Sequence, residues 1–489
     1  MTMSQGVAAL EFPLVIQGGM GAGVSNWMLA RAVSLRGQLG VVSGTVIDTI
    51  FSRRLQDGDQ GGHLRRAMEH FPIPAVAEAA LKRYFNPDGR APGAAYKALP
   101  TYKQVVSAAR QQLTMLASFV EVWLAKEGHR RPVGINVLTK VQMPNLATLY
   151  GAMLAGVDVV LMGAGIPREI PGALDALAVH QPATLRFDVE NGGADAEYLA
   201  FDPAEHGMPA AVGALKRPLF FPIVSANSLA TTLARKANGR VDGFVIEGPT
   251  AGGHNAPPRG TMQLSESGEP VYGERDVVDL EKMRELGLPF WLAGGTGSPD
   301  KLRAALDAGA AGIQVGTLFA FADESGVTAE LKARVLAGVN RGEVRVRTDP
   351  RASPTGYPFK LVEVAGGAGD FQSPARERIC DLGYLRSAYR KADGGIGYRC
   401  PAEPVDAYVA KGGTVEDTEG RRCLCNALLA NIGQAQLRPR WDDEQPLLTS
   451  GDDLAAMAPF LNGRTHYGVA DVLDYLLSEV GEQQSTVSS

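Results

Sequence analysis

Short apolar runs alternate with longer amphipathic stretches through the first two-thirds of the chain. Such runs, bounded by glycine or polar residues, are typical of buried parallel strands, and the stretches between them fit crossover helices. The pattern therefore predicts an α/β protein whose first domain, residues 1–344, is a (β/α)₈ TIM barrel. Its eight strands are expected at residues 14–17, 39–43, 133–138, 157–162, 220–225, 241–247, 290–293 and 312–315.

Two segments are too long to be simple connections between barrel strands. Residues 48–131 contain helical patterns such as VVSAARQQLTMLASFVEVWLAKEG, which predict a helical insertion able to cover a site at the barrel mouth. Residues 188–217 form a second insertion, rich in glycine, alanine and acidic residues. It carries no pattern that indicates a role.

The periodic pattern stops after Val344. Residues 345–489 begin with RTDPRASPTGYPFK, contain many glycines and all the cysteines, and predict a small irregular C-terminal domain. The final polar stretch, GEQQSTVSS, is expected to be disordered.

Composition and charge narrow the functional classes. The 489 residues are 45% hydrophobic and 21% charged, as in a globular enzyme, and the formal net charge is −5. Without an excess or a run of basic residues, nucleic acid is not an expected partner. The sequence shows neither a signal-peptide pattern nor an apolar stretch that could cross a bilayer, so we expect a cytoplasmic protein without a membrane partner. A homo-oligomer is left open.

The four cysteines, Cys380, Cys400, Cys423 and Cys425, all lie in one short C-terminal window. In a reducing compartment a structural disulfide is disfavoured, whereas four thiolates can hold zinc or an iron–sulfur cluster. Their spacing matches no paired CxxC signature. A metal or cluster site and buried inert thiols therefore both stand as interpretations.

Two glycine-containing loops predict a phosphate site. Gly294 and Gly295 end the seventh predicted strand, and Ser298 and Pro299 then provide an N-cap and a first helical residue. Gly316 and Thr317 repeat the arrangement one strand later. Either pair alone fits a tight turn, but barrels often bind phosphate between the loops after strands seven and eight, where helix N–H groups are exposed.

His254 is the strongest catalytic candidate. It lies in TAGGHN, directly after the sixth predicted strand, where barrel enzymes keep their reactive groups. An imidazole titrates near neutrality and therefore suits proton transfer. The remaining histidines are interpreted as structural or solvated: His63, His70, His129, His180, His206 and His466.

Five ordered motifs within residues 13–325 resemble the nitronate monooxygenase family, formerly called 2-nitropropane dioxygenases: PLVIQGGMGAGVS, VGINVL, ANSLATTLARKANGRVDGFVIEGPTAGGH, LAGGTGSPDKLRAALDAGAAGIQVGTLF and the acidic Glu324. The resemblance implies that the phosphate is that of FMN. It also implies cofactor contacts from Gln17, Gly18, Gly19, Met20, Asn136, Gly252, Gly253, Gly294, Gly295, Gly316 and Thr317.

In that family the histidine of the AGGH motif acts as a base or as a hydrogen-bond donor to the nitro or nitronate group, and His254 matches it. The chain departs from the family at Glu247, where glutamine is usual, and at Thr250, where glutamate is usual. Glu247, AGGHN and the start of the C-terminal segment also resemble the enoyl reductase subunit of polyunsaturated fatty acid and polyketide synthases. Glu247 is thus a second catalytic candidate, with a satisfied end-of-strand carboxylate as the alternative.

Three functions follow from these features. The first is oxidation of nitronates or nitroalkanes by oxygen to a carbonyl compound and nitrite. The second is reduction of an enoyl thioester, with NAD(P)H and an acyl carrier as partners. The third is a non-catalytic flavin-binding scaffold, which does not explain a histidine at the expected reaction centre. In all three the partner at the barrel mouth is a small molecule.

Overall fold

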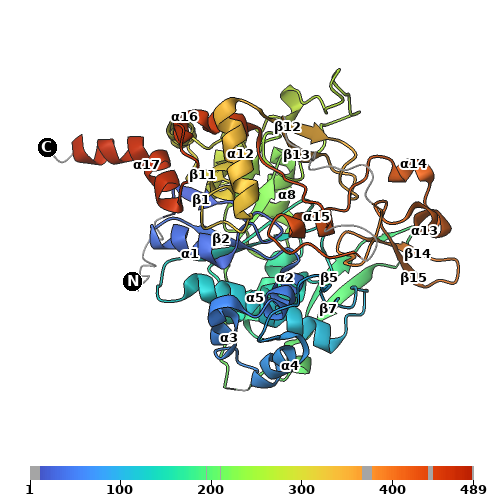
Figure 1. Cartoon of the computed structure of the whole chain (residues 1–489). Coiled ribbons are helices and arrows are strands. Elements are labelled where there is room, and N and C mark those ends of the chain that lie inside the picture. Colours follow the sequence, from blue (N-terminus) through green and yellow to red (C-terminus); the bar gives the residue numbers. More distant parts are fainter. Residues whose placement is uncertain (1–11, 194, 210, 366–376, 439–443, 487–489) are drawn as a thin grey trace.

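The structure is a computed structural model that describes residues 12–193, 195–209, 211–365, 377–438 and 444–486 (Figure 1). Eight parallel strands form its central sheet in the order β1-β11-β10-β9-β8-β4-β3-β2. A parallel bridge between Ile16 and Leu39 joins the two outer strands, and the Gln17 amide donates to the Leu39 carbonyl over 2.9 Å, so the sheet closes into a barrel.

All eight predicted barrel strands are confirmed. They are β1 (Val15–Gln17), β2 (Gly40–Ser43), β3 (Val133–Leu138), β4 (Val159–Gly163), β8 (Leu219–Val224), β9 (Phe244–Glu247), β10 (Phe290–Ala293) and β11 (Gly312–Val315). The predicted fold class, an α/β barrel, is therefore confirmed.

Side chains from alternate strand positions fill the barrel interior. Because successive residues of a strand point to opposite faces, one set packs inward and the other packs against the helices. The inward set forms its own cluster: Ile16, Val41, Val159, Leu161, Phe221, Val245 and Trp291. The larger outer set packs against the surrounding helices in a second cluster.

The helices between and after the barrel strands surround the barrel (Figure 1). Their apolar faces cover the outer surface of the sheet, as in other (β/α)₈ folds. They are α1 (Trp27–Leu35), α5 (Ala108–Lys126), α6 (Asn145–Leu154), α7 (Ile170–Ala178), α8 (Asn227–Lys236), α9 (Leu280–Arg284), α10 (Pro299–Asp307), α11 (Thr317–Ala320) and α12 (Ala329–Arg341), with the short η3 (Glu274–Asp276).

The first insertion is helical, as predicted, and precedes α5 with α2 (Ile47–Gln56), η1 (Gln60–Gly62), α3 (His63–Met68) and α4 (Pro74–Tyr84). In the second insertion β7 (Glu197–Phe201) pairs antiparallel with β5 (Ala183–Phe187) before η2 (Pro203–His206). Its β6 (Val189–Glu190) pairs with strand β14 of the C-terminal segment. The second insertion thus provides a strand on which the C-terminal segment pairs.

The C-terminal segment, residues 345–489, packs on the barrel (Figure 1). Leu448, Leu454 and Leu473 belong to the same hydrophobic core as the outer face of the barrel. The division into two domains at residue 344 therefore stays a prediction. Its elements, with β12 starting at the boundary, are β12 (Val344–Asp349), β13 (Phe359–Val364), β14 (Ser387–Arg390), β15 (Ile396–Arg399), α13 (Val405–Ala410), α14 (Val415–Thr418), α15 (Leu424–Ala430), η4 (Asp452–Met457), α16 (Ala458–Leu461) and α17 (Val469–Thr486).

Helix α17 extends further than the sequence pattern suggests. Disorder is expected from residue 481, but the helix continues through Thr486, and residues 487–489 lie outside the described residues. Val472, Leu473 and Leu476 anchor its first turns in the core, and an anchored helix propagates at low cost. Within the described part of the chain, no helix is both long and apolar enough to span a membrane.

Candidate active site

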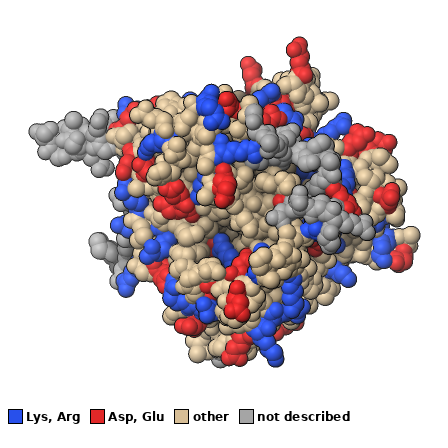
Figure 2. Space-filling model, viewed as in Figure 1, with Lys and Arg blue, Asp and Glu red and all other residues tan. Residues whose placement is uncertain are grey.

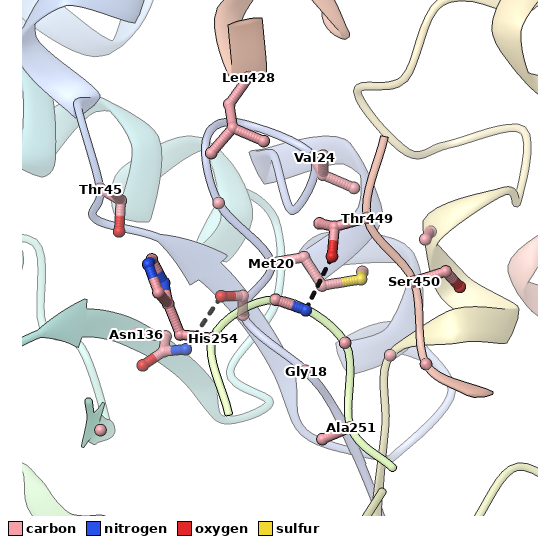
Figure 3. A pocket seen from close by; sticks show the side chains of 18 of the residues that line it. Gly18, Met20, Val24, Thr45, Asn136, Ala251, His254, Leu428, Thr449 and Ser450 are labelled. Carbon is pink, nitrogen blue, oxygen red and sulfur yellow. Dashed lines mark hydrogen bonds between the residues drawn. The ribbon is translucent and has the colours of Figure 1, made fainter. Parts of the chain in front are cut away.

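A cavity of about 240 Å³ opens at the carboxyl ends of the barrel strands. Loops after β1, β3, β9, β10 and β11 line one side of it, and residues of the C-terminal segment line the other. Figure 3 shows His254, Asn136 and Thr45 on one side and Thr449 and Ser450 on the other. The residues of the helical insertion, 48–131, are all described and none lines this cavity, so the suggested cover is not seen.

Most of the predicted cofactor contacts meet at this cavity. The lining includes Gly18, Gly19, Met20, Asn136, Gly252, Gly253, Gly294, Gly295, Gly316 and Thr317. Gln17 is absent from the lining, because its side chain lies fully buried behind the first loop. Its amide nitrogen donates to Ser25 Oγ over 2.8 Å, and its oxygen accepts from the Val41 amide over 3.0 Å. Gln17 therefore positions the loop.

The glycines after β10 and β11 are required for different reasons. Gly294 and Gly295 have φ of +93° and +65°, a region that other residues adopt at a cost. A Cβ on Gly294 would lie 3.0 Å from the Ala251 nitrogen, so the loops after β9 and β10 touch through backbone. Gly316 has an ordinary φ of −106°. A Cβ there would meet Met20 at 3.7 Å, so a side chain would fill open space at the cavity wall.

An acidic side chain from the C-terminal segment also enters the predicted phosphate site. Asp453 accepts hydrogen bonds from the Thr317 hydroxyl, over 2.5 Å, and from the Gly297 amide at the start of α10. Burial, helped by the neighbouring Asp452 charge, raises the pKa of Asp453. Protonated Asp453 can donate a hydrogen bond to a phosphate, whereas its ionised form repels one.

Several cavity-lining polar groups have no partner among the described residues. Such buried oxygens are costly unless a ligand or water pairs with them. They are Asn136 Oδ1, Gln314 Oε1, Asn431 Oδ1 and Ser450 Oγ. Together with the open space beside Gly316, they fit a planar heteroaromatic cofactor that carries a phosphate.

His254 lies at the end of a hydrogen-bond chain. The Thr355 amide donates to Ser353 Oγ over 3.2 Å, and Ser353 Oγ lies 2.7 Å from His254 Nε2. Phe359 packs edge-on against the imidazole with a ring-centroid distance of 4.8 Å. Burial, with a smaller contribution from the positive charge of Lys140, lowers the pKa of His254 to about 4. The imidazole is therefore neutral near pH 7.

Glu247 ends β9 and lines the same cavity. Burial raises the pKa of its carboxyl to about 7, because the charged form loses hydration in an apolar environment. Near neutral pH this group therefore exists in both forms. It donates a hydrogen bond or proton when protonated and accepts when ionised.

The C-terminal segment adds an apolar wall to the cavity. Leu385, Leu424 and Leu428 lie there beside Tyr384 and Phe359. A buried network holds Tyr384 in place. Its hydroxyl lies 2.7 Å from Thr49 Oγ1 and accepts from Arg110 over 3.1 Å, and it also donates to Asp48.

The four cysteines do converge, around a small separate cavity that all of them line. Nevertheless, the described residues contain no group of three or more His, Cys, Asp and Glu side chains arranged to hold a metal ion. The predicted zinc or iron–sulfur site is therefore not supported. Two of the thiols interact with each other instead: the neighbouring Cys400 lowers the pKa of Cys380.

Sequence reasoning missed the site residues that follow β13. Thr449 Oγ1 accepts from the Gly253 amide over 2.8 Å, as drawn in Figure 3, and Gly451 donates to Thr317 Oγ1 over 3.2 Å. These residues lie in an irregular stretch, LLTSGDDL, with no periodic pattern. The one available signal was its Ser-Gly-Asp-Asp composition, which is typical of turns and helix starts.

Residues 200–351 match the family model described as nitronate monooxygenase. This range contains Glu247, Gly252 to His254 and both glycine loops of the predicted phosphate site. The predicted resemblance is confirmed for this range, and the chain is an oxidoreductase of the flavin-dependent class. A comparison with curated proteins finds no match.

Similar solved structures include FabK from Thermotoga maritima, with 16% identity, a TM-score of 0.46, and coverage of 98% of this chain and 95% of that one. A nitroalkane oxidase from Streptomyces ansochromogenes has 17% identity, a TM-score of 0.44 and coverage of 97% and 98%. The enoyl reductase domain of MlnA from Bacillus amyloliquefaciens has 13% identity, a TM-score of 0.48 and coverage of 97% and 94%. At these values they carry no argument about the reaction.

Proposed function

We propose that this chain is an FMN-dependent enzyme that oxidises alkyl nitronates with oxygen to a carbonyl compound and nitrite. One observation carries the proposal. The loops that match the nitronate monooxygenase model meet at one cavity, where His254 shares the lining with the glycine loops of the predicted phosphate site. Bound FMN would supply the two-electron oxidation of the substrate and the reaction with oxygen.

The predicted phosphate site favours FMN over FAD as the cofactor. The loops after β10 and β11 provide one phosphate site, and no GxGxxG motif follows an early strand to take a second nucleotide. Gly316 and Ser450 would hold the phosphate, beside the Asp453 carboxyl. Asn136 and Gln314, with their unpaired oxygens, would face the polar edge of the ring.

The variant Gly316→Val tests the predicted phosphate site. Its backbone is unstrained and the added Cβ meets Met20 only at ordinary contact distance, so the fold should persist while the side chain fills the predicted phosphate site. We expect unchanged melting of the apoprotein and a loss of FMN affinity of at least about 10-fold. Mass spectrometry of the released flavin identifies it, and finding FAD would overturn the assignment.

The site fits a nitronate anion better than a neutral nitroalkane. A base with a pKa of about 4 removes a carbon-bound proton poorly, because proton transfer is efficient when the catalytic pKa lies near the operating pH. A neutral imidazole that accepts from Ser353 at Nε2 instead carries its proton on Nδ1, ready to donate to a nitronate oxygen. Lys140 adds an attractive positive charge nearby, and the leucine wall accommodates an alkyl chain.

Enoyl thioester reduction is the second candidate, favoured by Glu247. A carboxyl with a pKa of about 7 in an apolar cavity is a competent proton donor to a carbon that receives hydride. Anaerobic mixing separates the candidates. Rapid bleaching of the flavin by an alkyl nitronate, without bleaching by NADPH, supports the oxidase. Bleaching by NADPH supports the reductase, and bleaching by neither supports a non-catalytic scaffold.

A further inference from the structure

The C-terminal segment places two thiols in contact close to the active-site cavity. Cys400 follows β15 and is buried, whereas Cys380 is partly exposed and lies before the turn at Gly383. The two thiols interact, and this interaction lowers the pKa of Cys380 and raises that of Cys400. The two sulfurs thus face each other although 20 positions separate them in the sequence.

Hydrogen bonds of the residues on both sides of Cys380 hold it near Cys400. Arg378 donates from Nη1 to the Pro401 carbonyl over 2.9 Å and from Nη2 to the Thr418 carbonyl over 2.7 Å. On the other side, Asp381 accepts from Asn426 over 2.8 Å and from Arg438 over 2.6 Å. Because residues 378 and 381 are both tied down, the approach of Cys380 to Cys400 is part of the fold.

The remaining two cysteines also contact groups outside the pair. Cys423 Sγ accepts from Asn426 over 3.5 Å and faces the Ile379 carbonyl at 3.7 Å. Cys425 Sγ accepts from the amides of Tyr384 and Leu385. Both line the small cavity with the pair, so they serve as matched controls in the same environment.

We propose that Cys380 and Cys400 are a redox-active thiol pair that hydrogen peroxide oxidises to a disulfide. The more acidic Cys380 attacks as the thiolate on one peroxide oxygen, the O–O bond breaks, and hydroxide leaves. Cys380 is then a sulfenic acid. Cys400 gives its proton to hydroxide and attacks the Cys380 sulfur, the S–O bond breaks, and the second oxygen leaves as water after protonation. Two thiols and one peroxide thus give one disulfide and two waters.

A disulfide between Cys380 and Cys400 would affect the active-site cavity through residues that line both cavities. Leu385, Leu424 and Cys425 line both the cysteine cavity and the larger cavity, and Tyr384 lies four residues after Cys380. A disulfide would tie the segment that carries Tyr384 and Leu385 to the β14–β15 hairpin. Forming a covalent bond of about 2 Å would draw the Cys380 side chain toward Cys400, because Cys400 is the more deeply packed partner.

The experiment is peptide mapping of the full chain after treatment with equimolar hydrogen peroxide. We expect a mass loss of about 2 Da and a peptide crosslinked between Cys380 and Cys400, both reversed by dithiothreitol. Cys423→Ser and Cys425→Ser should retain the crosslink. Cys400→Ser should stop at the sulfenic acid, so that a 1,3-diketone probe labels Cys380 on the order of 10-fold more than in the wild type.

Three results would overturn the proposal, and none depends on whether the chain oxidises nitronates. The first is a wild-type map without the Cys380–Cys400 crosslink. The second is equal diketone labelling of Cys380 in the wild type and Cys400→Ser. The third is one zinc or iron retained per chain in protein purified without chelator, with thiols that react only after the metal is removed. Because the wild-type map needs no substitution, a misfolded variant does not affect the outcome.

Discussion

The barrel loops and the C-terminal segment build the same cavity by different means. The barrel contributes the His254 imidazole, the Glu247 carboxyl and loop backbone, and its glycines let neighbouring loops touch. The C-terminal segment contributes side chains, namely the hydroxyls of Thr449 and Ser450, the carboxyl of Asp453 and the apolar wall around Leu428. Under the proposed function, the barrel would provide the chemistry and the segment would set affinity and shape.

The C-terminal segment also contacts the His254 loop directly. The Lys360 amide donates to the Gly253 carbonyl over 3.0 Å, and the Asn255 amide donates to the Pro358 carbonyl over 2.9 Å. Two elements more than a hundred residues apart therefore hold the histidine between them. A variant in either region should reveal which property that region controls.

Removing the imidazole should have the largest effect. We expect His254→Ala to lower kcat/KM for an alkyl nitronate by roughly 10² to 10³, the usual cost of losing one preorganised donor to a developing anion. His254→Asn keeps an N–H donor and should lose about 10-fold. Flavin content, measured by absorbance, should be unchanged in both. An unaltered kcat/KM in His254→Ala would show that the barrel does not supply the chemistry.

A matched pair of glycine variants tests the contact between the regions. A Cβ at Gly252 would lie 2.7 Å from the Ser450 carbonyl carbon and 2.9 Å from the Gly451 nitrogen, whereas a Cβ at Gly253 meets nothing within 4 Å. Gly252→Ala should therefore cost about 2 to 3 kcal/mol of unfolding free energy and weaken FMN binding. Gly253→Ala should cost about 1 kcal/mol, from its φ of +79° alone. Denaturant unfolding measures both, and equal costs would contradict the contact.

The barrel could be predicted from the sequence better than the C-terminal segment could. Strand positions and the His254 loop follow from apolar periodicity and glycine placement, because regular elements impose a period on their residues. Thr449, Ser450 and Asp453 lie in an irregular segment, and only the tertiary fold brings them to the cavity. No sequence periodicity marks them. Gln17 differs from these residues, since its place in a motif predicts a cofactor contact, whereas in the structure its buried side chain makes hydrogen bonds that support the first loop.

The titration of Glu247 should set the upper pH limit of activity. With a pKa of about 7, the carboxyl is protonated and neutral below pH 7 and ionised above it. An ionised carboxylate in the cavity repels a nitronate, so kcat/KM should fall by roughly 10-fold per pH unit above pH 7. Glu247→Gln cannot ionise and should show no such fall. A decline that persists in Glu247→Gln would assign it to another group.

Asp453 gives the smallest effect and the most direct test of the division between the regions. Its raised pKa means that the protonated fraction declines as pH rises, and each ionised carboxylate then adds repulsion toward a phosphate at the start of α10. FMN affinity of the wild type should therefore fall with rising pH, whereas Asp453→Asn should bind FMN a few-fold more tightly at high pH, on the order expected for relief of one screened like-charge contact.

Riboflavin is the control, because it lacks the phosphate and should bind both proteins equally. Turnover of a saturating nitronate by the fully loaded enzymes should also be equal, since the proposal puts Asp453 at the cofactor phosphate and His254 at the substrate. Tighter binding of riboflavin as well as FMN would instead mean that Asp453→Asn acts by reshaping the cavity, and a changed turnover at saturation would show that the C-terminal segment contributes to the chemistry.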